Sequence, residues 1–444
     1  MSRSDPPHPP ETWAPARRAV AAIAGPIQRI LAIEAASGVV LLVATVTAMI
    51  LANLWRGYDE LWRIPLGGRL GPWSFEQPLR FWINDGLMTV FFFIVGLEIR
   101  RETFEGELAG VRKAALPLAA AIGGMLVPAA IFVMFNTGRA GAAGWAIPMA
   151  TDIAFAVGVL TLLGGRAHPA LRVLLLALAV IDDIGAIIVI AIFYSAGISL
   201  AGLALAAAGA ASVVAMRGAG VRTPLLYAAP GIVLWAGLLA AGVHPTIAGV
   251  ALGLLTPVRP WFGRSGFAAT TQAHLDQLGA TDRDALLVSL DRIDEARREA
   301  VSPVERLIHA LHPWVAFVVM PIFALANAGV RVGGARLSGD DRWLFAGIVV
   351  GLAAGKPIGI AAATFGASRL GVATSSDDFT TRGVLLVGLV GGIGFTMSLF
   401  IAQLAFPPGP LLETAKLAIL VGSGVAIVVG LLFGVHSARF VRRE

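Results

Sequence analysis

The residues most able to do chemistry are charged side chains that stand inside long apolar stretches. Asp182 and Asp183 lie together in LALAVIDDIGAIIVIAIFY, near the centre of an apolar run over 171–195. A charged side chain at the centre of a membrane costs roughly 2.5–3.5 kcal/mol on the insertion scale, so its presence calls for a reason. Consecutive helical residues point about 100° apart, which lets both carboxylates face one cavity. Such a pair can hold protons or a hard cation, whose preferred ligands are oxygens. The alternative is that one Asp is protonated and merely hydrogen-bonded inside the protein.

Two further charges stand in apolar segments beside features that interrupt a helix. Asp152 lies in AIPMATDIAFAVGVL, where Pro148 cannot donate a backbone hydrogen bond and Thr151 can satisfy freed backbone groups. We expect a broken helix with Asp152 at the half-helix ends, which carry partial charges of about half a unit. The alternative is a capping Asp nearer the membrane interface. Lys356, followed by a proline, would pair with a buried carboxylate or neutralise the carbonyl end of a broken helix.

A second interruption is predicted in GLVGGIGFTMSLFIA, residues 388–402. Its three closely spaced glycines are followed by Thr396 and Ser398, whose hydroxyls can replace lost backbone hydrogen bonds. Two interrupted spans in corresponding halves of a chain point to a transport site near the middle of the membrane.

The composition identifies the solvent in which these segments lie. The chain has 444 residues, of which 57% are hydrophobic and 14% charged, which is too apolar for a soluble protein of this length. The absence of cysteine excludes disulfides, thiolate metal sites and cysteine nucleophiles. No basic helix with interleaved aromatics accompanies the net charge of +6, so we expect no nucleic-acid partner. The fold class that follows is an all-α, multi-pass membrane protein.

About twelve apolar runs approach the roughly 20 residues that cross a bilayer. They cover 31–54, 82–99, 114–135, 145–164, 171–195, 198–216, 223–241, 244–257, 310–329, 343–366, 383–405 and 411–434. The first run is too long for a signal peptide and is expected to be retained. With this count, 24 of the 34 Lys and Arg residues lie on the side of the two termini and eight on the other, which predicts cytoplasmic termini. The predicted division is a tail (1–30), spans one to eight (31–257), an extended cytoplasmic loop (258–304), spans nine to twelve (305–435) and a second tail (436–444).

Two segments that connect predicted spans have sequence patterns that predict secondary structure. Residues 61–80 alternate apolar and polar side chains around Gly67 and Gly68, which predicts an external β-hairpin. The 258–304 loop has apolar residues at helical spacing from Leu286 to Ile293, with Asp294 and Arg298 four positions apart. This pattern predicts a helix on the cytoplasmic surface.

Seven motifs together resemble the NhaA-type sodium/proton antiporters, in family order and over nearly the whole chain. They are INDGLMTVFFFIVGLEIRRE (83–102), ATDIAFAVGVL (150–160), AVIDDIGAIIVIA (179–191), GVHPTIAGV (242–250), HPWVAFVVMPIFALANAGV (312–330), GKPIGI (355–360) and GGIGFTMSLFIA (391–402). The resemblance implies twelve helices containing two inverted-topology repeats of three helices. Its fourth and eleventh helices are discontinuous and cross where they unwind.

The resemblance also implies roles for individual residues. Asp183 matches the ion-binding carboxylate of the family and Asp182 its partner, which is paired with Lys356. Asp152 and Lys356 match the residues that compensate the broken-helix charges, with Thr151 as a polar neighbour.

A second group of positions concerns pH and assembly. Glu98, Glu102 and His244 match positions tied to the pH response; otherwise the two glutamates are interface carboxylates paired with neighbouring arginines, and the histidine is structural. Ile308 and Glu305 depart from the family pattern, which leaves the pH profile open. The 61–80 hairpin lies where the family makes its dimer contact.

The function expected from the resemblance is export of Na⁺ or Li⁺ in exchange for H⁺ across the bacterial inner membrane by alternating access, with two protons per sodium and activation by pH. The partners would be these ions, the lipid bilayer and a second copy of the chain, with no cofactor and no enzymatic reaction. The main alternative is a transporter of similar fold for another substrate, such as an organic anion. Two other classes of protein are disfavoured. An intramembrane aspartyl protease needs its aspartates on different helices, whereas Asp182 and Asp183 are adjacent. A channel does not need broken helices with compensating charges.

Overall fold

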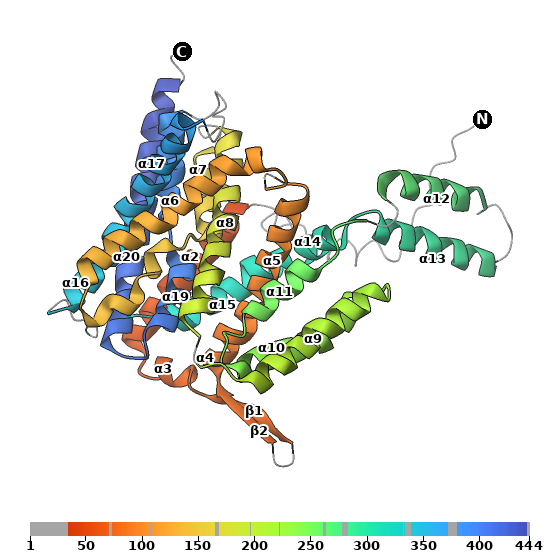
Figure 1. Ribbon diagram of the computed structural model, residues 1–444, viewed down its shortest axis with the longest axis horizontal. Helices are drawn as coiled ribbons and strands as arrows, with labels where there is room; N and C mark the ends of the chain where they lie inside the picture. The colour runs from red at the N-terminus through yellow and green to blue at the C-terminus, as the bar shows by residue number, and fades with distance from the viewer. Residues whose placement is uncertain are drawn as a thin grey trace, which may run out of the picture.

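The computed structural model describes residues 34–441 except 71–72, 107, 165–167, 196, 222, 261–262, 278–282, 332, 334–338 and 372–379. The predicted tail 1–30 and the first residues of the first predicted span lie outside the described residues. Most of the described chain forms a bundle of helices (Figure 1). Helix α20 continues to Val441, so the first residues of the predicted second tail, 436–441, belong to that helix.

The bundle helices, in chain order, are α2 (Glu34–Leu54), α5 (Met88–Phe104), α6 (Val111–Asn136), α7 (Ile153–Leu162), α8 (Pro169–Phe193), α9 (Leu200–Gly218), α10 (Ala228–Ala241), α11 (Ile247–Leu255), α14 (Pro303–Trp314), α15 (Met320–Asn327), α16 (Asp341–Val350), α17 (Lys356–Arg369), α18 (Thr381–Gly391), α19 (Phe395–Ala405) and α20 (Pro410–Val441). Shorter helical pieces join them: α3 (Tyr58–Leu61), α4 (Leu79–Phe81), η2 (Trp82–Leu87), η3 (Ala140–Gly144), η4 (Ile147–Met149), η6 (Pro224–Tyr227), η7 (Val315–Val319) and η8 (Gly351–Gly355). Of these, η2, η7 and η8 are π-helical, a geometry that is frequent at functional sites.

Nine helices of the described chain are long and apolar enough to cross a membrane. They are Ala36–Leu54, Leu79–Phe104, Lys113–Asn136, Pro169–Phe193, Leu200–Gly218, Pro224–Ala241, Pro303–Asn327, Asp341–Arg369 and Pro410–Ser437. Two bent pairs of helices raise the number to as many as eleven. The predicted span 244–257 contains α11, which has nine residues and is shorter than the roughly 20 that cross a bilayer.

The two bent pairs lie where the sequence predicts interruptions. Ala140–Met149 and Ile153–Leu162 meet at 48°, and Thr381–Gly391 and Phe395–Ala405 meet at 47°. The backbone leaves the helical path after Pro148, which lacks a backbone N–H, and again within the glycine-rich stretch before Phe395. The two breaks touch, because the Asp152 backbone N–H donates to the Ile393 carbonyl oxygen at 2.7 Å.

Glycines let several helices approach to backbone contact, as is common in membrane bundles. Helices α6 and α17 pack closely, and a Cβ atom on Gly359 would collide with the backbone of Gly123. Helices α5 and α11 meet in the same way at Gly96 and Gly253. Both α6 and α5 also pack against α8.

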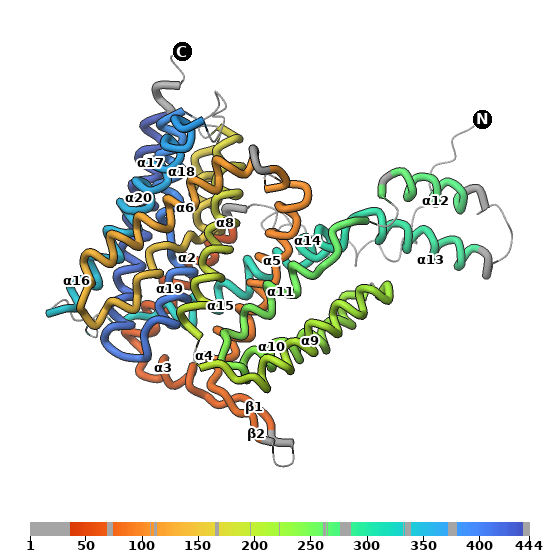
Figure 2. The backbone as a smooth tube through the Cα atoms, viewed as in Figure 1, coloured from red at the N-terminus to blue at the C-terminus, as the bar shows by residue number. Residues whose placement is uncertain are grey.

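Two elements project from the bundle, and both contain structure that the sequence patterns predict. The antiparallel strands β1 (Pro65–Leu70) and β2 (Trp73–Pro78) form the hairpin, with Pro65 opposite Pro78. Gly67 and Gly68 lie within β1 rather than at the turn. The 258–304 loop contains α12 (Gly263–Gln277) and α13 (Arg283–Glu299), which extend together away from the bundle (Figures 1 and 2). The expected pair joins Arg298 Nη2 to Asp294 Oδ2 at 2.5 Å, whereas the sequence analysis missed α12.

The contact between α6 and α17 predicts a stability difference between two Gly→Ala substitutions on one helix. Gly359→Ala should lower the free energy of unfolding by about 1–3 kcal/mol, because the added methyl group overpacks a backbone contact. Gly366→Ala is the matched control, since nothing lies within 4 Å of its Cβ position, and it should be neutral or stabilising. Denaturant titration of the purified variants in detergent measures both. Equal stability of the two variants would contradict the tight crossing.

Candidate ion-binding site

The carboxylate of Asp152 lies at the N-termini of two helices at once. It caps α7, where its Oδ1 accepts from the Phe155 backbone N–H at 3.1 Å. Its Oδ2 accepts from the Thr396 backbone N–H at 3.1 Å and also from the Thr396 hydroxyl, in the first turn of α19. Helix N-termini carry partial positive charge and unsatisfied N–H groups, so one negative side chain satisfies both broken helices. Asp152 is therefore a capping residue, but it is 1% exposed and lies in the core.

The carbonyl ends at the same crossing are satisfied by Lys356 and Thr151. Lys356 is the first residue of α17, directly after the π-helix η8, and its ammonium donates to the carbonyl oxygen of Met149 at the end of η4. The Thr151 hydroxyl lies 3.0 Å from the Gly391 carbonyl oxygen at the end of α18. Because helix C-termini carry partial negative charge, a buried ammonium is stabilised there.

Lys356 and Thr151 also connect this crossing to Asp182 on α8. The Lys356 ammonium lies 2.5 Å from Asp182 Oδ2, and both side chains are fully buried. The Thr151 hydroxyl lies 2.6 Å from the same oxygen. Its single hydrogen serves either Asp182 or the Gly391 carbonyl at one time. Both roles considered for Lys356, ion pairing and neutralising a carbonyl end, are present together.

Two carboxylate oxygens on α8 remain without a hydrogen-bond partner in the described part of the chain. They are Asp182 Oδ1 and Asp183 Oδ2, on residues that are 1% and 2% exposed. Buried polar atoms are nearly always hydrogen-bonded, so unsatisfied ones require an explanation. A proton on either carboxylate or a hard cation between them would supply the missing interaction. The neighbouring hydroxyl of Thr151 adds a third oxygen of the same kind.

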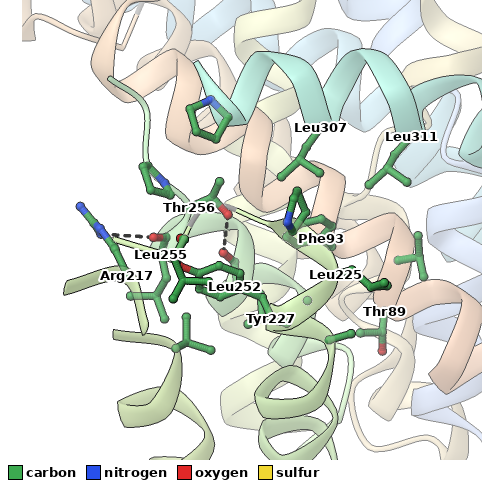
Figure 3. Close-up of a pocket in the computed structure, with 18 of the residues that line it drawn as sticks. Thr89, Phe93, Arg217, Leu225, Tyr227, Leu252, Leu255, Thr256, Leu307 and Leu311 are labelled. Atoms are coloured by element: carbon green, nitrogen blue, oxygen red, sulfur yellow. Dashed lines mark hydrogen bonds between the residues drawn. The ribbon is translucent and has the colours of Figure 1, made fainter. Parts of the chain in front are cut away.

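Both carboxylates are buried. A cavity of about 530 Å³ lies between α5, α9, α11 and α14, and neither Asp182 nor Asp183 lines it (Figure 3). Among the described residues, no group of three or more His, Asp or Glu side chains is arranged to hold a metal ion permanently. Exchange of an ion with either side of the membrane therefore requires movement of the helices around α8.

Two of the residues matched to the pH response lie on a helix that packs against α8. Glu98 and Glu102 are on α5, which packs on α8 through Val95, Ile99 and Val180. Glu102 Oε1 lies 3.4 Å from an Arg101 nitrogen, as the interface alternative predicts.

The two departures from the family pattern have structural roles near α14. Ile308 is buried against Leu97 and Val304. Glu305 helps Ser302 to cap α14, because its backbone N–H donates to Ser302 Oγ at 3.2 Å and its carboxylate accepts from that hydroxyl.

His244 pairs with a carboxylate that the sequence analysis did not single out. Its Nε2 lies 3.4 Å from Asp85 Oδ1, and its Nδ1 lies 2.8 Å from Thr246 Oγ1. Asp85 belongs to the π-helix η2 at the start of the second predicted span. The criterion that identified Asp152 and Asp182, a charged residue in an apolar run, would also have identified Asp85.

A ring of three side-chain amides joins η2, α15 and α19 on the hairpin side of the site. Asn84 Nδ2 donates to Gln403 Oε1 at 2.6 Å, Asn327 Nδ2 donates to Asn84 Oδ1 at 2.7 Å, and Gln403 donates to Asn327 Oδ1. Beside it, Phe400 of α19 packs against Phe92 and the His244 ring, with ring centroids 5.4 and 5.3 Å apart. The ring and these aromatic side chains fasten α19 to its neighbours.

Comparison with known proteins covers almost the whole chain. Residues 28–433 match the family described as Na+/H+ antiporter 1. The "Na(+)/H(+) antiporter NhaA 2" of Sorangium cellulosum is 54% identical over 435 residues, covering 96% of this chain and 93% of the relative. The protein of the same name from Myxococcus xanthus is 51% identical, covering 98% and 95%. "Na(+)/H(+) antiporter NhaA" of Bordetella petrii is 47% identical, covering 94% and 91%.

One solved structure is similar to this chain, but its sequence identity is much lower than that of these relatives. The sodium proton antiporter MjNhaP1 from Methanocaldococcus jannaschii at pH 8 has 14% identity and a TM-score of 0.48, covering 95% of this chain and 94% of that one. This degree of likeness is too low to bear on the site.

The pair of Lys356 and Asp182 predicts strong coupling between two substitutions. Lys356→Met leaves the Asp182 carboxylate buried without its cation, which should cost roughly 3–5 kcal/mol of unfolding free energy. Asp182→Asn should also destabilise, because it leaves the ammonium unpaired. The double variant should be more stable than the sum of the single losses predicts, by at least about 1 kcal/mol. Denaturant titration of the four proteins gives this coupling, and strict additivity would exclude the ion pair.

Proposed function

The chain belongs to the Na+/H+ antiporter 1 family, and on that premise we propose that it exchanges sodium ions for protons across a membrane. The observation that carries the proposal is the pair of buried carboxylate oxygens without partners, Asp182 Oδ1 and Asp183 Oδ2. Protons and Na⁺ compete for these oxygens, so the site holds one or the other. Since an empty anionic pair is costly to bury, the site changes sides only when it is loaded. Competition at one site is enough to couple the two fluxes.

The path of the spans follows from the bent pairs. We take each bent pair as one discontinuous span and α11 as a short span, which adds three to the nine long helices and makes twelve. The chain segments around α6, α7 and α8 then form one set of three spans with a broken middle member. The segments from α16 to α20 form a second such set, and this supports a pair of inverted repeats. The 24-to-8 distribution of Lys and Arg supports cytoplasmic termini in the inner membrane.

The transport cycle follows from the enclosure of the site. The carboxylates take Na⁺ or Li⁺ from the cytoplasm, the bundle closes, and the ion leaves outside in exchange for two protons. One net charge then crosses per cycle, so a membrane potential of 100 mV contributes about 2.3 kcal/mol to export. Lys356 already neutralises Asp182, so a cation that binds Asp182 must displace the ammonium.

The proposed function includes activation by pH and assembly into a dimer. Glu98, Glu102 and His244 set the pH at which exchange begins, and none of them takes part in the hydrogen bonds that Asp152, Thr151 and Lys356 make. The hairpin β1–β2 projects from the bundle and offers a second copy a dimer contact (Figure 1). The mass of the solubilised particle with and without residues 65–78 tests that contact.

Replacing one carboxylate separates this proposal from its alternatives. In everted vesicles, Asp183→Asn should reduce Na⁺-dependent proton movement to the level of vesicles without the protein, because the amide cannot balance a cation. Asp294→Asn, on the exposed face of α13, is the matched control and should keep the wild-type rate. Dequenching of a proton-gradient dye on adding Na⁺, without any organic solute, measures both. Normal exchange by Asp183→Asn would overturn the assignment, and exchange that requires an organic anion would favour the alternative transporter.

Competition between protons and Na⁺ also determines the direction in which the apparent KM for Na⁺ changes with pH. As pH falls, protons occupy the carboxylates and the apparent KM for Na⁺ should rise. The rise should be about tenfold per pH unit if one proton must leave and about a hundredfold if two must leave. The KM measured over several pH values gives this slope. Glu98→Ala should move the pH at which activity begins and keep the slope, and a KM independent of pH would refute competition.

A further inference from the structure

The pair of helices α12 and α13, which has no part in the proposed ion exchange, buries polar atoms rather than large apolar side chains. The two helices pack chiefly against each other. Among their described side chains, Ala296 is the only hydrophobic one that is buried, and Ser289 is buried near it. The Thr271 Oγ1 and His274 Nδ1 atoms of α12 are also buried, with no hydrogen-bond partner among the described residues. The large apolar side chains of α13 are therefore left on the outside of the pair.

These side chains form a stripe along α13. Leu286, Leu290 and Ile293 recur at spacings of four and three residues, which places them on one side of the helix, and Leu287 borders them. The three leucines are 40–55% exposed. Alternating spacings of four and three are the pattern by which one helix packs along another, and a contiguous exposed apolar patch marks an interaction site. We call these four residues the α13 stripe.

The charge of α13 disfavours the membrane surface as the partner of the stripe. Helices that lie on a membrane are rich in Lys and Arg and commonly present Trp or Phe to the acyl chains. Helix α13 has no aromatic residue, and its acidic residues outnumber its arginines. The acidic residues are Asp284, Asp291, Asp294, Glu295 and Glu299, and the arginines are Arg283, Arg292, Arg297 and Arg298. On the cytoplasmic side, where the proposed orientation places the pair, anionic lipids would repel this helix.

A second copy of the chain fits the stripe better, because the proposed dimer contact is small. Strands β1 and β2 have six residues each, whereas a stable interface uses about 20–30 residues a side. A dimer of this chain therefore needs a further contact. In Figure 1 the α12–α13 pair projects from the bundle on the same side as β1–β2, away from α16.

We propose that the α13 stripe is a second dimer contact, formed with the same stripe of a second copy of the chain. In a two-fold symmetric dimer the same surface of each copy meets its equivalent, and an apolar seam can do so without opposing like charges. The neighbouring Asp294 carboxylate already pairs with Arg297 and Arg298 of its own helix, at 2.7 and 2.5 Å. The inference rests on the dimer of the proposed function. It adds a cytoplasmic contact to the external one at β1–β2, so the copies are held at both membrane surfaces.

Photochemical cross-linking tests which partner covers the stripe. The chain contains no cysteine, so one introduced cysteine is a unique point of attachment. In membranes, Leu290→Cys labelled with benzophenone maleimide should give a covalent dimer on illumination, with both linked peptides from α12–α13. A mixture of ¹⁴N and ¹⁵N copies shows that the link joins two chains. Glu295→Cys is the matched control, because its site is also exposed but lies about 140° around the helix, and it should give about tenfold less dimer.

The affinity of the two copies provides a second measurement. The triple variant Leu286→Gln/Leu287→Gln/Leu290→Gln keeps helix-forming side chains but removes the apolar seam. The dissociation constant of the solubilised dimer should therefore rise at least about tenfold. The control Arg292→Gln/Glu295→Gln leaves the net charge unchanged and lies away from the stripe, so it should keep the wild-type dissociation constant. Particle mass over a dilution series measures all three proteins.

Three outcomes would overturn the stripe contact. The first is capture of lipid by labelled Leu290→Cys, which would indicate the membrane surface. The second is capture of residues 1–30, which would indicate the N-terminal tail. The third is an unchanged dissociation constant in the leucine triple variant. A wild-type dimer without a link at position 290 refutes this contact alone, whereas a wild-type monomer also refutes the proposed dimer. Neither measurement involves transport, so loss of Na⁺/H⁺ exchange bears only on the proposed function.

Discussion

Electrostatic balance at the point where two bent helix pairs meet is the constraint on which the structure depends. Each bend places a helix C-terminus and a helix N-terminus inside the bundle, where their unsatisfied backbone groups need partners. Asp152 satisfies the N-terminal ends through α7 and α19, while Lys356 and Thr151 satisfy the carbonyl ends of η4 and α18. These charges are the reason that irregular backbone can persist in the core. They also bring Lys356 to Asp182, so the groups that stabilise the breaks also determine the state of the neighbouring carboxylates.

The two aspartates on α8 are adjacent in sequence but differ in surroundings. Asp182 has one oxygen that accepts from an ammonium and a hydroxyl and one without a hydrogen-bond partner, whereas Asp183 Oδ2 has no hydrogen-bond partner among the described residues. Such asymmetry suits a carrier better than a permanent metal site, which would satisfy every ligand from the protein. A loosely held ion can leave, while a fully coordinated one would be trapped. The unpaired oxygens cost free energy of folding, and the same lack of protein partners lets the transported ion leave.

Much of the site could be predicted from the sequence because charged residues in apolar runs are rare. Asp152, Asp182, Asp183 and Lys356 are conspicuous for this reason, and Pro148 and the 391–394 glycines indicate the breaks. The partnership of Asp152 with Thr396 could not be predicted from residue properties alone, because it joins positions 244 residues apart. The amide ring of Asn84, Asn327 and Gln403 was missed since uncharged polar residues are ordinary in membrane helices. Helix α12 was missed because its sequence has little apolar periodicity.

Helix α19 has eleven residues and is about 16 Å long, at 1.5 Å per residue. One end is fixed at Asp152 and the other carries Gln403 into the amide ring. A short helix that is held at both ends moves as one rigid body. Any tilt of α19 that separates Thr396 from Asp152 would also disturb the hydrogen bonds of Gln403, about 10 Å further along the helix, so the two ends of α19 cannot move independently.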